Sequence, residues 1–445
     1  MPQPVRHAHA RPATVALALA AAIAVAAGAA VGFSAGNAAD ARAGAAPVVE
    51  DAPNGEPTPS SPAPTASSAP SPSATPTEEA ERDVRFTLVA GGDVLTHMPV
   101  NDSAATEDGY DFTPLFAGLR PYLEGADLAI CHLEVPVSPG DTPPSGYPVF
   151  SAPSALVRDL KEVGWDGCST ASNHSVDKGV AGVESTLAAF DANLLQHAGT
   201  ARTEDESEQV AYYAVQDGDR TVKVAHLSFA YGTNGMPVSQ PWEVDLFDAD
   251  DADASPIIDA AQRARDDGAD VVIASVHCCV EYRTEPTDAQ RSLATQIAES
   301  GLVDLYIGHH AHVPQPIELL PGGPSGEGMW TAFGLGNLLS NQDSWCCAPE
   351  TANGVLLDAT FTVTPDGAVS VDAGWVATTV DRRDGHSVRA LADIADGAGT
   401  LSAADVAARH ALVRDAVGDQ PTEVTEPPAS LAEHAFALLR PAPGA

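Results

Sequence analysis

The chain has 445 residues, of which 22 are Lys or Arg and 61 are Asp or Glu, so its formal net charge at pH 7 is −39. No run of basic residues interrupts this acidic balance, which excludes the class of proteins that bind nucleic acid through a basic face. Hydrophobic residues make up 44% of the chain, enough for a sizeable core, and the acidic excess is typical of a soluble exported protein.

The N-terminus has the layout of a targeting segment. Arg6 and Arg11 precede an uncharged apolar run, residues 13–33, and small residues follow around Asn37. This order predicts a signal peptide in residues 1–40, although the run is also long enough to act as an uncleaved N-terminal membrane anchor. No Cys follows the run directly, which argues against a lipoprotein. Both interpretations place the protein outside the cell or at its surface.

Pro, Ser, Thr and Ala dominate the next segment, residues 41–83. A segment of this composition cannot bury enough apolar surface to fold. We therefore expect a disordered, semi-extended linker that holds the folded part away from a membrane or wall.

From residue 84 onward, apolar strands alternate with amphipathic helices, which predicts an α/β fold. Five predicted strands each end next to residue types that bind metal ions. The strands are residues 84–90, 127–133, 165–171, 270–276 and 302–307. The residues that follow them are Asp93, Glu134, the pair Asn173 and His174, His277, and the cluster His309, His310 and His312.

These strand ends are expected to converge, because ligands of α/β sheets bind at the carboxyl ends of the strands. Each residue alone has an ordinary interpretation as a turn former, a cap or a buried polar group. Together they offer carboxylate, amide and imidazole ligands suited to divalent ions, and more of them than one ion needs. The pattern predicts a two-metal centre, although it does not distinguish Mn, Fe, Zn and Mg.

Two further segments, residues 211–229 and 354–376, are typical of β-hairpins with a turn that contains Asp-Gly. Hairpins beside a strand–helix core favour two sheets stacked between helices. We expect one domain over residues 84–388. The remainder, residues 389–445, is predicted to be a helical segment with a Pro-rich tail.

Six short motifs occur in the order GGDVLTH, CHLEVPVS, TASNHSVDKG, SVHCCVEY, YIGHHAHVPQPIE and FGLGNLLSNQ. As a set they resemble the CapA-like capsule synthesis family, which is linked to poly-γ-glutamate and is similar in fold to the calcineurin-like metallophosphatases. The resemblance covers about residues 85–381. It implies a metallophosphatase-like α/β fold with two stacked β-sheets flanked by helices, a four-layer αββα arrangement.

The resemblance also implies roles for individual residues. It makes Asp93 a ligand of one metal and Glu134 the bridging carboxylate. It makes Asn173 a ligand of the second metal, beside a catalytic His174 that steadies a substrate oxygen or leaving group. The remaining ligands that it implies are His277, His310 and His312, and it leaves His309 as a spare histidine that either binds a metal or donates a hydrogen bond to a ligand.

The chain departs from the metallophosphatase pattern at two places. Leu95 stands where a ligand histidine is usual, and His97 is the nearest alternative ligand. Glu134 stands where the bridging residue is usually Asp. Both departures bear on whether the site is a competent phosphatase. The residues expected to line the substrate cleft are Glu281, Tyr282, Gln315 and Asn337.

The six cysteines are Cys131, Cys168 and the adjacent pairs Cys278–Cys279 and Cys346–Cys347. An even number in an exported chain is typical of disulfides. Cys131 and Cys168 lie in two predicted strands, and these two cysteines are either bonded to each other or simply buried. For the adjacent pairs we predict at least one disulfide between the two loops, with soft-metal binding or redox chemistry as the alternative.

Three functions are consistent with these observations. The first is an exported CapA-like protein whose two metal ions act in synthesis, export, attachment or trimming of an anionic surface polymer such as poly-γ-glutamate. Its partners would be that polymer and membrane-bound polymer synthesis machinery. The second is a secreted metal-dependent phosphoesterase with a phosphoester substrate. The third is a non-catalytic scaffold that binds the polymer.

Overall fold

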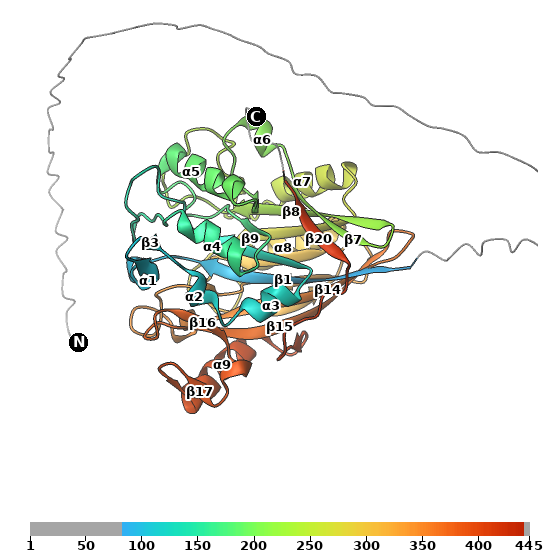
Figure 1. Ribbon diagram of the computed structural model, residues 1–445. Coiled ribbons are helices and arrows are strands. Elements are labelled where there is room, and N and C mark those ends of the chain that lie inside the picture. The colour runs from blue at the N-terminus through green and yellow to red at the C-terminus, as the bar shows by residue number, and fades with distance from the viewer. Residues whose placement is uncertain (1–81, 440–445) are drawn as a thin grey trace, which may run out of the picture. The chain divides into compact units, whose positions relative to one another are not determined.

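The computed structural model describes residues 82–439 (Figure 1). The predicted signal peptide or anchor and nearly all of the predicted linker lie outside the described residues. Among the helices formed by residues 82–439, none combines the length and apolar character that a bilayer span requires.

The first of two large sheets has nine strands. Its order is β16–β15–β14–β1–β4–β5–β6, with β13 paired to β1 and β19 paired to β15. The strands are β1 Val84–Val94, β4 Leu128–Leu133, β5 Gly167–Ser169, β6 Gln196–Ala198, β13 Asn337–Leu339, β14 Asn353–Val363, β15 Val369–Asp381, β16 Ser387–Ala390 and β19 Thr422–Glu423. Strands β1, β4, β5 and β6 are mutually parallel, so their carboxyl ends share one edge.

The second sheet has seven strands in the order β11–β12–β10–β9–β8–β7–β20. They are β7 Ala211–Asp217, β8 Arg220–Ala230, β9 Val271–His277, β10 Leu305–His309, β11 Ile317–Leu320, β12 Met329–Ala332 and β20 His434–Leu438. Strands β8, β9 and β10 are parallel neighbours. The two predicted hairpins are confirmed as the antiparallel pairs β7–β8 and β14–β15.

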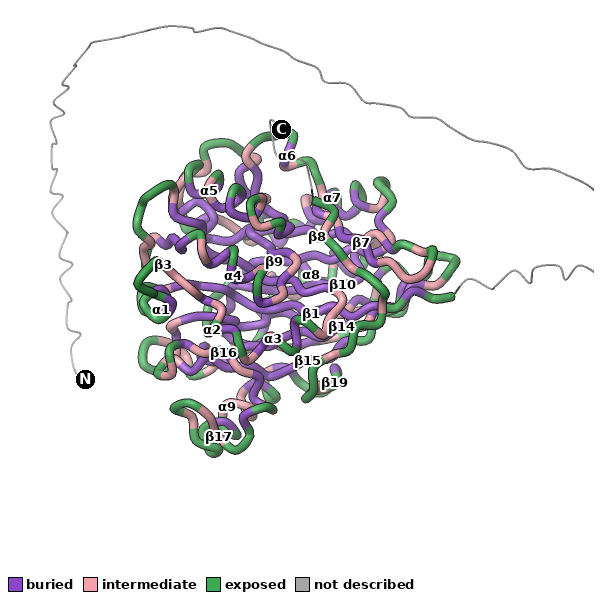
Figure 2. Tube along the Cα trace, in the orientation of Figure 1, coloured by how far each residue is buried: buried purple, intermediate pink, exposed green. Residues whose placement is uncertain are grey.

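The two sheets face each other across a shared apolar core, seen as the buried centre of Figure 2. Alternate residues of each strand point to opposite faces. In β1, for example, Phe86 and Leu88 face the second sheet, whereas Val89 faces the helices on the outside. Phe86 also stacks on its register partner Phe361, with ring centroids 4.8 Å apart. The hydrophobic alternation of the sequence thus sets both faces of the sandwich.

Helices cover the two outer faces. Helices α2 to α5 pack on the first sheet, and α7 and α8 pack on the second. The helices are α1 Met98–Ala104, α2 Thr113–Phe116, α3 Arg120–Gly125, α4 Ala155–Val163, α5 Gly179–Ala192, α6 Glu204–Ser207, α7 Ser255–Asp266, α8 Asp288–Ser300 and α9 Ala403–Val417, with 3₁₀ turns η1 Pro349–Ala352 and η2 Ala392–Ile394. Two short hairpins complete the described part, β2 Ala105–Thr106 with β3 Gly109–Tyr110 and β17 Gly397–Ala398 with β18 Leu401–Ser402. The predicted four-layer αββα arrangement is confirmed.

The C-terminal segment is only partly helical, which corrects the prediction for residues 389–445. Helix α9 packs against β14 and β15 through Val406, Val413 and Val417. Beyond it, β20 adds an antiparallel strand to the edge of the second sheet beside β7. A strand there satisfies the open backbone groups of β7, a tertiary effect that local sequence does not reveal.

The cysteines lie in two kinds of surroundings. The structure joins Cys131 to its register partner Cys168 on the adjacent strand, which is the first of the two alternatives. Cys278 is buried in the apolar cluster under α8, whereas Cys346 and Cys347 lie on an exposed loop. The disulfide between these two loops stays a prediction.

Two glycines allow strands of both sheets to approach other chain segments closely. A Cβ on Gly92 would lie 2.0 Å from the carbonyl oxygen of Gly336, and a Cβ on Gly308 would lie 1.9 Å from that of Phe333. Backbone oxygens cannot move aside as a flexible side chain can. Any larger residue at these positions must therefore displace a strand end.

We expect Gly308→Ala to lower the free energy of unfolding by about 1–3 kcal/mol, because the added methyl group clashes with backbone. The matched control is Gly232→Ala, where an added Cβ meets no atom within 4 Å. Chemical denaturation of both variants measures the difference. Equal free energies of unfolding for the two variants would contradict this prediction, because they would mean that the backbone at Phe333 moves aside without destabilising the fold.

Candidate metal centre

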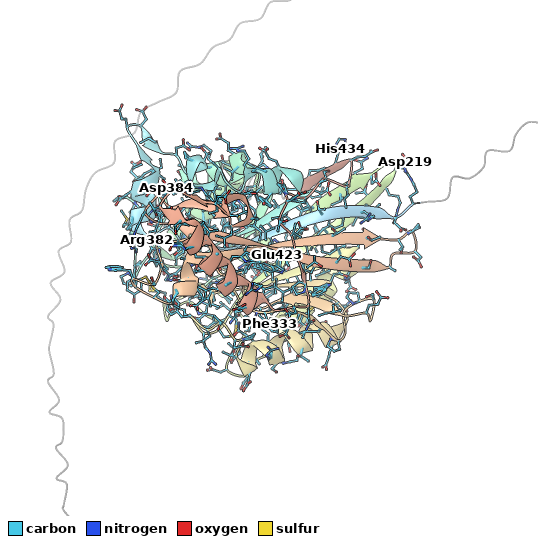
Figure 3. The ribbon with its side chains drawn as sticks, turned by 90° about the horizontal axis from the view of Figure 1, so that it is seen from below. Asp219, Phe333, Arg382, Asp384, Glu423 and His434 are labelled. Carbon is cyan, nitrogen blue, oxygen red and sulfur yellow. A yellow bond between two sulfur atoms is a disulfide. The ribbon has the colours of Figure 1, made fainter. Side chains whose placement is uncertain are left out.

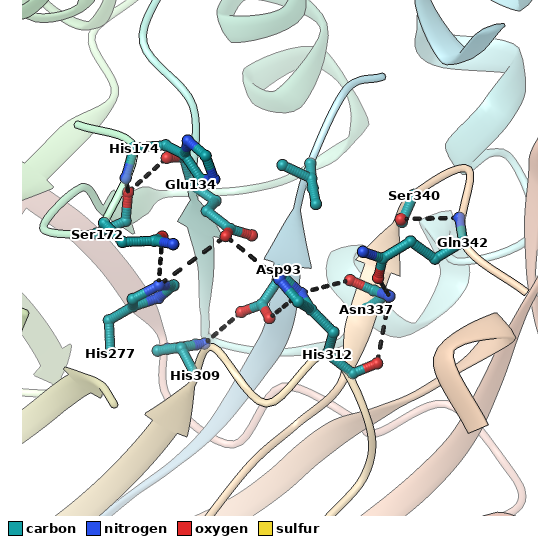
Figure 4. Close-up of polar contacts among 12 residues, drawn as sticks. Asp93, Glu134, Ser172, His174, His277, His309, His312, Asn337, Ser340 and Gln342 are labelled. Carbon is teal, nitrogen blue, oxygen red and sulfur yellow. Dashed lines mark hydrogen bonds and ion pairs between the residues drawn. The ribbon is translucent and has the colours of Figure 1, made fainter. Parts of the chain in front are cut away.

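The ends of five parallel strands meet at one edge of the sandwich (Figure 4). Strands β1, β4 and β5 reach this edge from the first sheet, and β9 and β10 reach it from the second. The register places Asp93 of β1 beside His132 of β4, and His277 of β9 beside His309 of β10. Packing of one sheet on the other therefore brings these four side chains into one buried cluster.

Six side chains form two groups, each able to hold a metal ion. Asp93, His132 and His309 form the first, with ligand atoms within 4.8 Å of one another. In it, His309 Nδ1 lies 3.3 Å from Asp93 Oδ1, and the rings of His132 and His309 stack at 4.1 Å. The second group lies beside it and consists of Glu134, His310 and His312.

His312 connects the two groups. Its Nδ1 lies 3.0 Å from Asp93 Oδ2, and its Nε2 lies 3.6 Å from Glu134 Oε1. The side chain of Asn337 accepts a hydrogen bond from His312 Nδ1 at 3.1 Å, which fixes the orientation of the ring. The His312 ring therefore has one carboxylate on either side.

Both carboxylates are buried without hydrogen bonds. Asp93 and Glu134 are 0% exposed, and within residues 82–439 none of their four oxygens has a hydrogen-bond partner. Leaving such groups without a partner is costly, on the order of a few kcal/mol each. A divalent cation compensates both charge and missing donors, so the residues present fit metal ions.

The surrounding electrostatics point the same way. Burial lowers the pKa of His132 and His277 well below the usual value and that of His310 to about 3, so these imidazoles are neutral and can donate lone pairs. Burial likewise raises the pKa of the Glu134 carboxyl well above the usual value. For His312 the effect of burial is outweighed by Glu134 and Asp93, which raise its pKa to about 10.

The backbone at the site adopts the left-handed region at four residues that are not glycine. The φ angles are 85° at His310, 57° at His312, 63° at Tyr282 and 53° at Asn234. Such conformations persist only where the surrounding structure imposes them, and they cluster at functional sites. Here they accompany the placement of His310 and His312 beside Glu134.

The predicted ligands Asn173 and His277 lie against the second group rather than within it. His277 Nε2 donates to Asn173 Oδ1 at 2.9 Å and lies 3.9 Å from Glu134 Oε1. His277 Nδ1 lies 2.9 Å from His132 Nε2, so this histidine links both groups. His309, expected as a spare donor, instead belongs to the first group.

His174 stands beside Glu134 with its orientation fixed. Its Nδ1 lies 2.8 Å from Asp177 Oδ2, and its ring packs edge-on against Phe150. Ser172 ties this residue to the site, because its Oγ accepts from the His174 backbone N–H and donates to the backbone oxygen of Glu134. The remaining ring nitrogen, Nε2, is left for contact with a substrate or with Asn234, whose Nδ2 is 3.4 Å away.

Three residues of the site were missed by the sequence prediction. His132 lies inside a predicted strand and was given no role, although the motif CHLE places it two residues before Glu134. Tyr231 and Asn234 follow β8, a sixth strand end at the same edge. Tyr231 packs on His310 with ring centroids 4.7 Å apart, and Asn234 Oδ1 accepts from Asn173. The usable signal was the Tyr-Gly-Thr-Asn-Gly turn directly after an apolar strand.

The expected cleft residues divide into two kinds. Glu281 and Tyr282 are exposed at the mouth of the site, where the Tyr282 ring lies 6.0 Å from that of His312. Gln315 and Asn337 are fully buried and hold the structure together instead of lining a cleft. Gln315 donates to the backbone oxygen of Arg283 and accepts from Gln290, which corrects its predicted role.

His97, the predicted substitute for the missing histidine at position 95, is not part of either group. Its ring packs edge-on against Phe150, and its Nδ1 contacts the backbone at Leu95. The histidine that the family pattern has at position 95 is replaced in the first group by His132 of the neighbouring strand β4. Adjacent strands can supply the same ligand because their register aligns Asp93 with His132.

Comparison with known proteins gives relatives of low identity. The chain is 26% identical over 281 residues to "Capsule biosynthesis protein CapA" of Bacillus anthracis, covering 60% of this chain and 62% of that protein. It is 28% identical over 186 residues to "PGA biosynthesis protein CapA" of Bacillus subtilis (strain 168), covering 42% and 45%. The matched part therefore spans less than two thirds of either relative.

Two solved structures also align, each over 67% of this chain. One is described as a novel phosphatase from Mycoplasma pneumoniae, with TM-score 0.38, 13% identity and 95% of that chain covered. The other is the calcineurin-like phosphoesterase YfkN from Bacillus subtilis, with TM-score 0.39, 14% identity and 91% covered.

A family profile described as "Bacterial capsule synthesis protein PGA_cap" matches residues 87–342. This range contains both groups of candidate metal ligands and is more than half of the chain. The chain therefore belongs to the bacterial capsule synthesis protein family PGA_cap.

Proposed function

We propose that this protein is an exported enzyme that acts on an anionic surface polymer such as poly-γ-glutamate. With two divalent metal ions it would either hydrolyse bonds of the polymer or transfer part of the polymer to an amine or hydroxyl group. The observation that carries the proposal is the pair of buried carboxylates, Asp93 and Glu134, which have no hydrogen-bond partner within residues 82–439 and are grouped with four histidines. The printed names of the two relatives, which concern capsule and PGA biosynthesis, support the choice of polymer.

The first step in the proposed function is binding of the two metal ions. Asp93, His132 and His309 would hold one ion, and Glu134, His310 and His312 the other. Two divalent ions so placed polarise a carbonyl or phosphoryl oxygen and stabilise the negative charge that develops during reaction. Asn337 orients the ligand His312 through its side-chain oxygen, and Asn173 likewise orients His277, which lies against both groups.

His174 provides the proton chemistry. Asp177 fixes Nδ1 as the protonated nitrogen and stabilises the imidazolium that forms when Nε2 accepts a proton. Nε2 can then return that proton to a departing amine or alcohol. The same residue serves hydrolysis and transfer, because the two reactions differ only in whether water or another nucleophile attacks.

The proposed role places the domain outside the cell, beside the machinery that makes the polymer. The apolar run at residues 13–33 and the Pro-rich segment at residues 41–83 support export followed by a spacer. Cell fractionation with N-terminal sequencing tests this part. Recovery of the protein from the cytosol with residues 1–40 intact would contradict it.

Removing one ligand from either group should remove an ion. We expect His132→Ala and His310→Ala each to bind about one ion fewer per chain than the parent, because each truncation leaves its group with two ligands. His97→Ala is the control, since His97 belongs to neither group. Elemental analysis of the dialysed proteins gives the metal content. Unchanged metal in both ligand variants would refute the grouping.

His174→Ala should keep its metal and its stability but lose activity by about 10²–10⁴-fold, the range typical of a positioned general acid or base. Product analysis on poly-γ-glutamate and on a chromogenic phosphodiester, with the metal-replete protein, measures the loss. Turnover of the phosphodiester alone would favour a phosphoesterase. Full activity of His174→Ala on whichever substrate the parent turns over would end the catalytic assignment.

A further inference from the structure

A second site of interest lies on the face that carries α9, away from the buried ligands (Figure 3). A cavity of about 270 Å³ opens there between α9, the turn after β15 and the loop after β13. Three arginines line it, Arg382, Arg383 and Arg409. The whole chain has only 22 Lys and Arg against 61 Asp and Glu, so three in one cavity is a marked concentration of cationic groups.

The guanidinium of Arg409 is only partly satisfied. Its Nη1 donates to Thr379 Oγ1 at 2.5 Å and to the backbone oxygen of Val380 at 3.0 Å. Among residues 82–439 no carboxylate lies within ion-pair distance of it, although burial lowers its pKa. Arg383, exposed at the rim, likewise has no ion pair with any described residue. Arginine remains charged in proteins, so both groups can accept an anion.

The carboxylates that line the cavity are already engaged. Asp381 accepts from the Thr400 hydroxyl and backbone N–H at 2.6 and 2.7 Å. Asp405 caps the start of α9 through Ser402, and Asp343 pairs with Arg382 at 3.2 Å. The unsatisfied groups of the cavity are therefore donors. Its formal charges cancel, so it suits weak, directional binding of a carboxylate better than strong binding of any anion.

The loop after β13 joins this cavity to the metal centre. Gln342 donates to Tyr282 Oη and accepts from Asn337, which holds His312. One residue earlier, the backbone oxygen of Asn341 accepts from Arg382 at 3.3 Å. The next residue, Asp343, lines the cavity itself. One short loop thus separates the site of chemistry from the arginines.

We propose that this cavity is a remote subsite that binds a carboxylate of the polymer substrate while another part of the same polymer occupies the metal centre. The inference rests on the proposed function and adds to it a preference for long polyacids. Each contact is weak, but a second contact on the same molecule is made at high effective concentration, so affinity increases with chain length. A free monomer spans only one of the two sites and gains nothing.

The test is titration calorimetry of the metal-loaded full chain with long poly-γ-glutamate and with free glutamate. We expect Arg409→Gln and Arg383→Gln each to weaken binding of the polymer about tenfold, the usual effect of losing a hydrogen bond to a charged group. The metal content and the affinity for free glutamate should stay unchanged. The matched control is Arg414→Gln, which lies on the same helix, is exposed and pairs with Asp415 outside the cavity.

The outcomes separate this inference from the proposed function. If the parent binds the polymer and both cavity variants bind it as Arg414→Gln does, the subsite is overturned and the proposed function stands. If the parent does not bind the polymer at all, the proposed function fails and the subsite with it. Arg383→Gln decides the matter if Arg409→Gln loses stability, because the exposed Arg383 side chain makes no hydrogen bond within residues 82–439.

Discussion

Two carboxylates buried without hydrogen-bond donors are the constraint on which the rest of this structure depends. Asp93 and Glu134 stand at the ends of neighbouring parallel strands, where backbone geometry fixes them a short distance apart. Buried carboxylates are destabilising unless their charge is compensated. His132 and His310 are neutral and offer lone pairs, whereas His312, whose pKa the two carboxylates raise, lies beside both of them as a cation. A bound divalent cation would compensate the carboxylates and use the lone pairs at once.

The centre draws its ligands from both sheets, which makes sheet packing part of its chemistry. Asp93, His132 and Glu134 come from the first sheet, and His309, His310 and His312 from the second. The position of one set relative to the other is set by the apolar core between the sheets. Neighbouring side chains then fix the candidate ligands, among them Asn337 of β13 on His312 and Ser172 of the loop after β5 beside Glu134. Small shifts in sheet packing are therefore expected to change metal geometry.

Most of the framework could be predicted from the sequence because it follows from hydrophobic periodicity. The five strands, the two hairpins and the helices between them have local patterns that match their burial. Asp93, Glu134 and the histidine loop were found because each directly follows such a strand. The strand β20 was not, since its segment HAFAL is rich in Ala and Leu and becomes extended only through pairing with β7.

Details of the centre depend on register, which local sequence does not contain. His132 was not singled out because it lies within an apolar strand and not after it, yet the register with β1 makes it the partner of Asp93. Gln315 was assigned to the cleft, but contacts with Arg283 and Gln290 bury it. The surroundings of the cysteines likewise depend on tertiary structure, because sequence does not show that Cys278 faces the core and the 346–347 pair faces solvent.

The most direct test of the central claim is anomalous X-ray diffraction from crystals of the domain grown with Mn²⁺. The account predicts two anomalous peaks, one among Asp93, His132 and His309 and the other among Glu134, His310 and His312. Absence of an anomalous peak at both groups would contradict it, with Asp93 and Glu134 instead hydrogen-bonded to water or to protein donors.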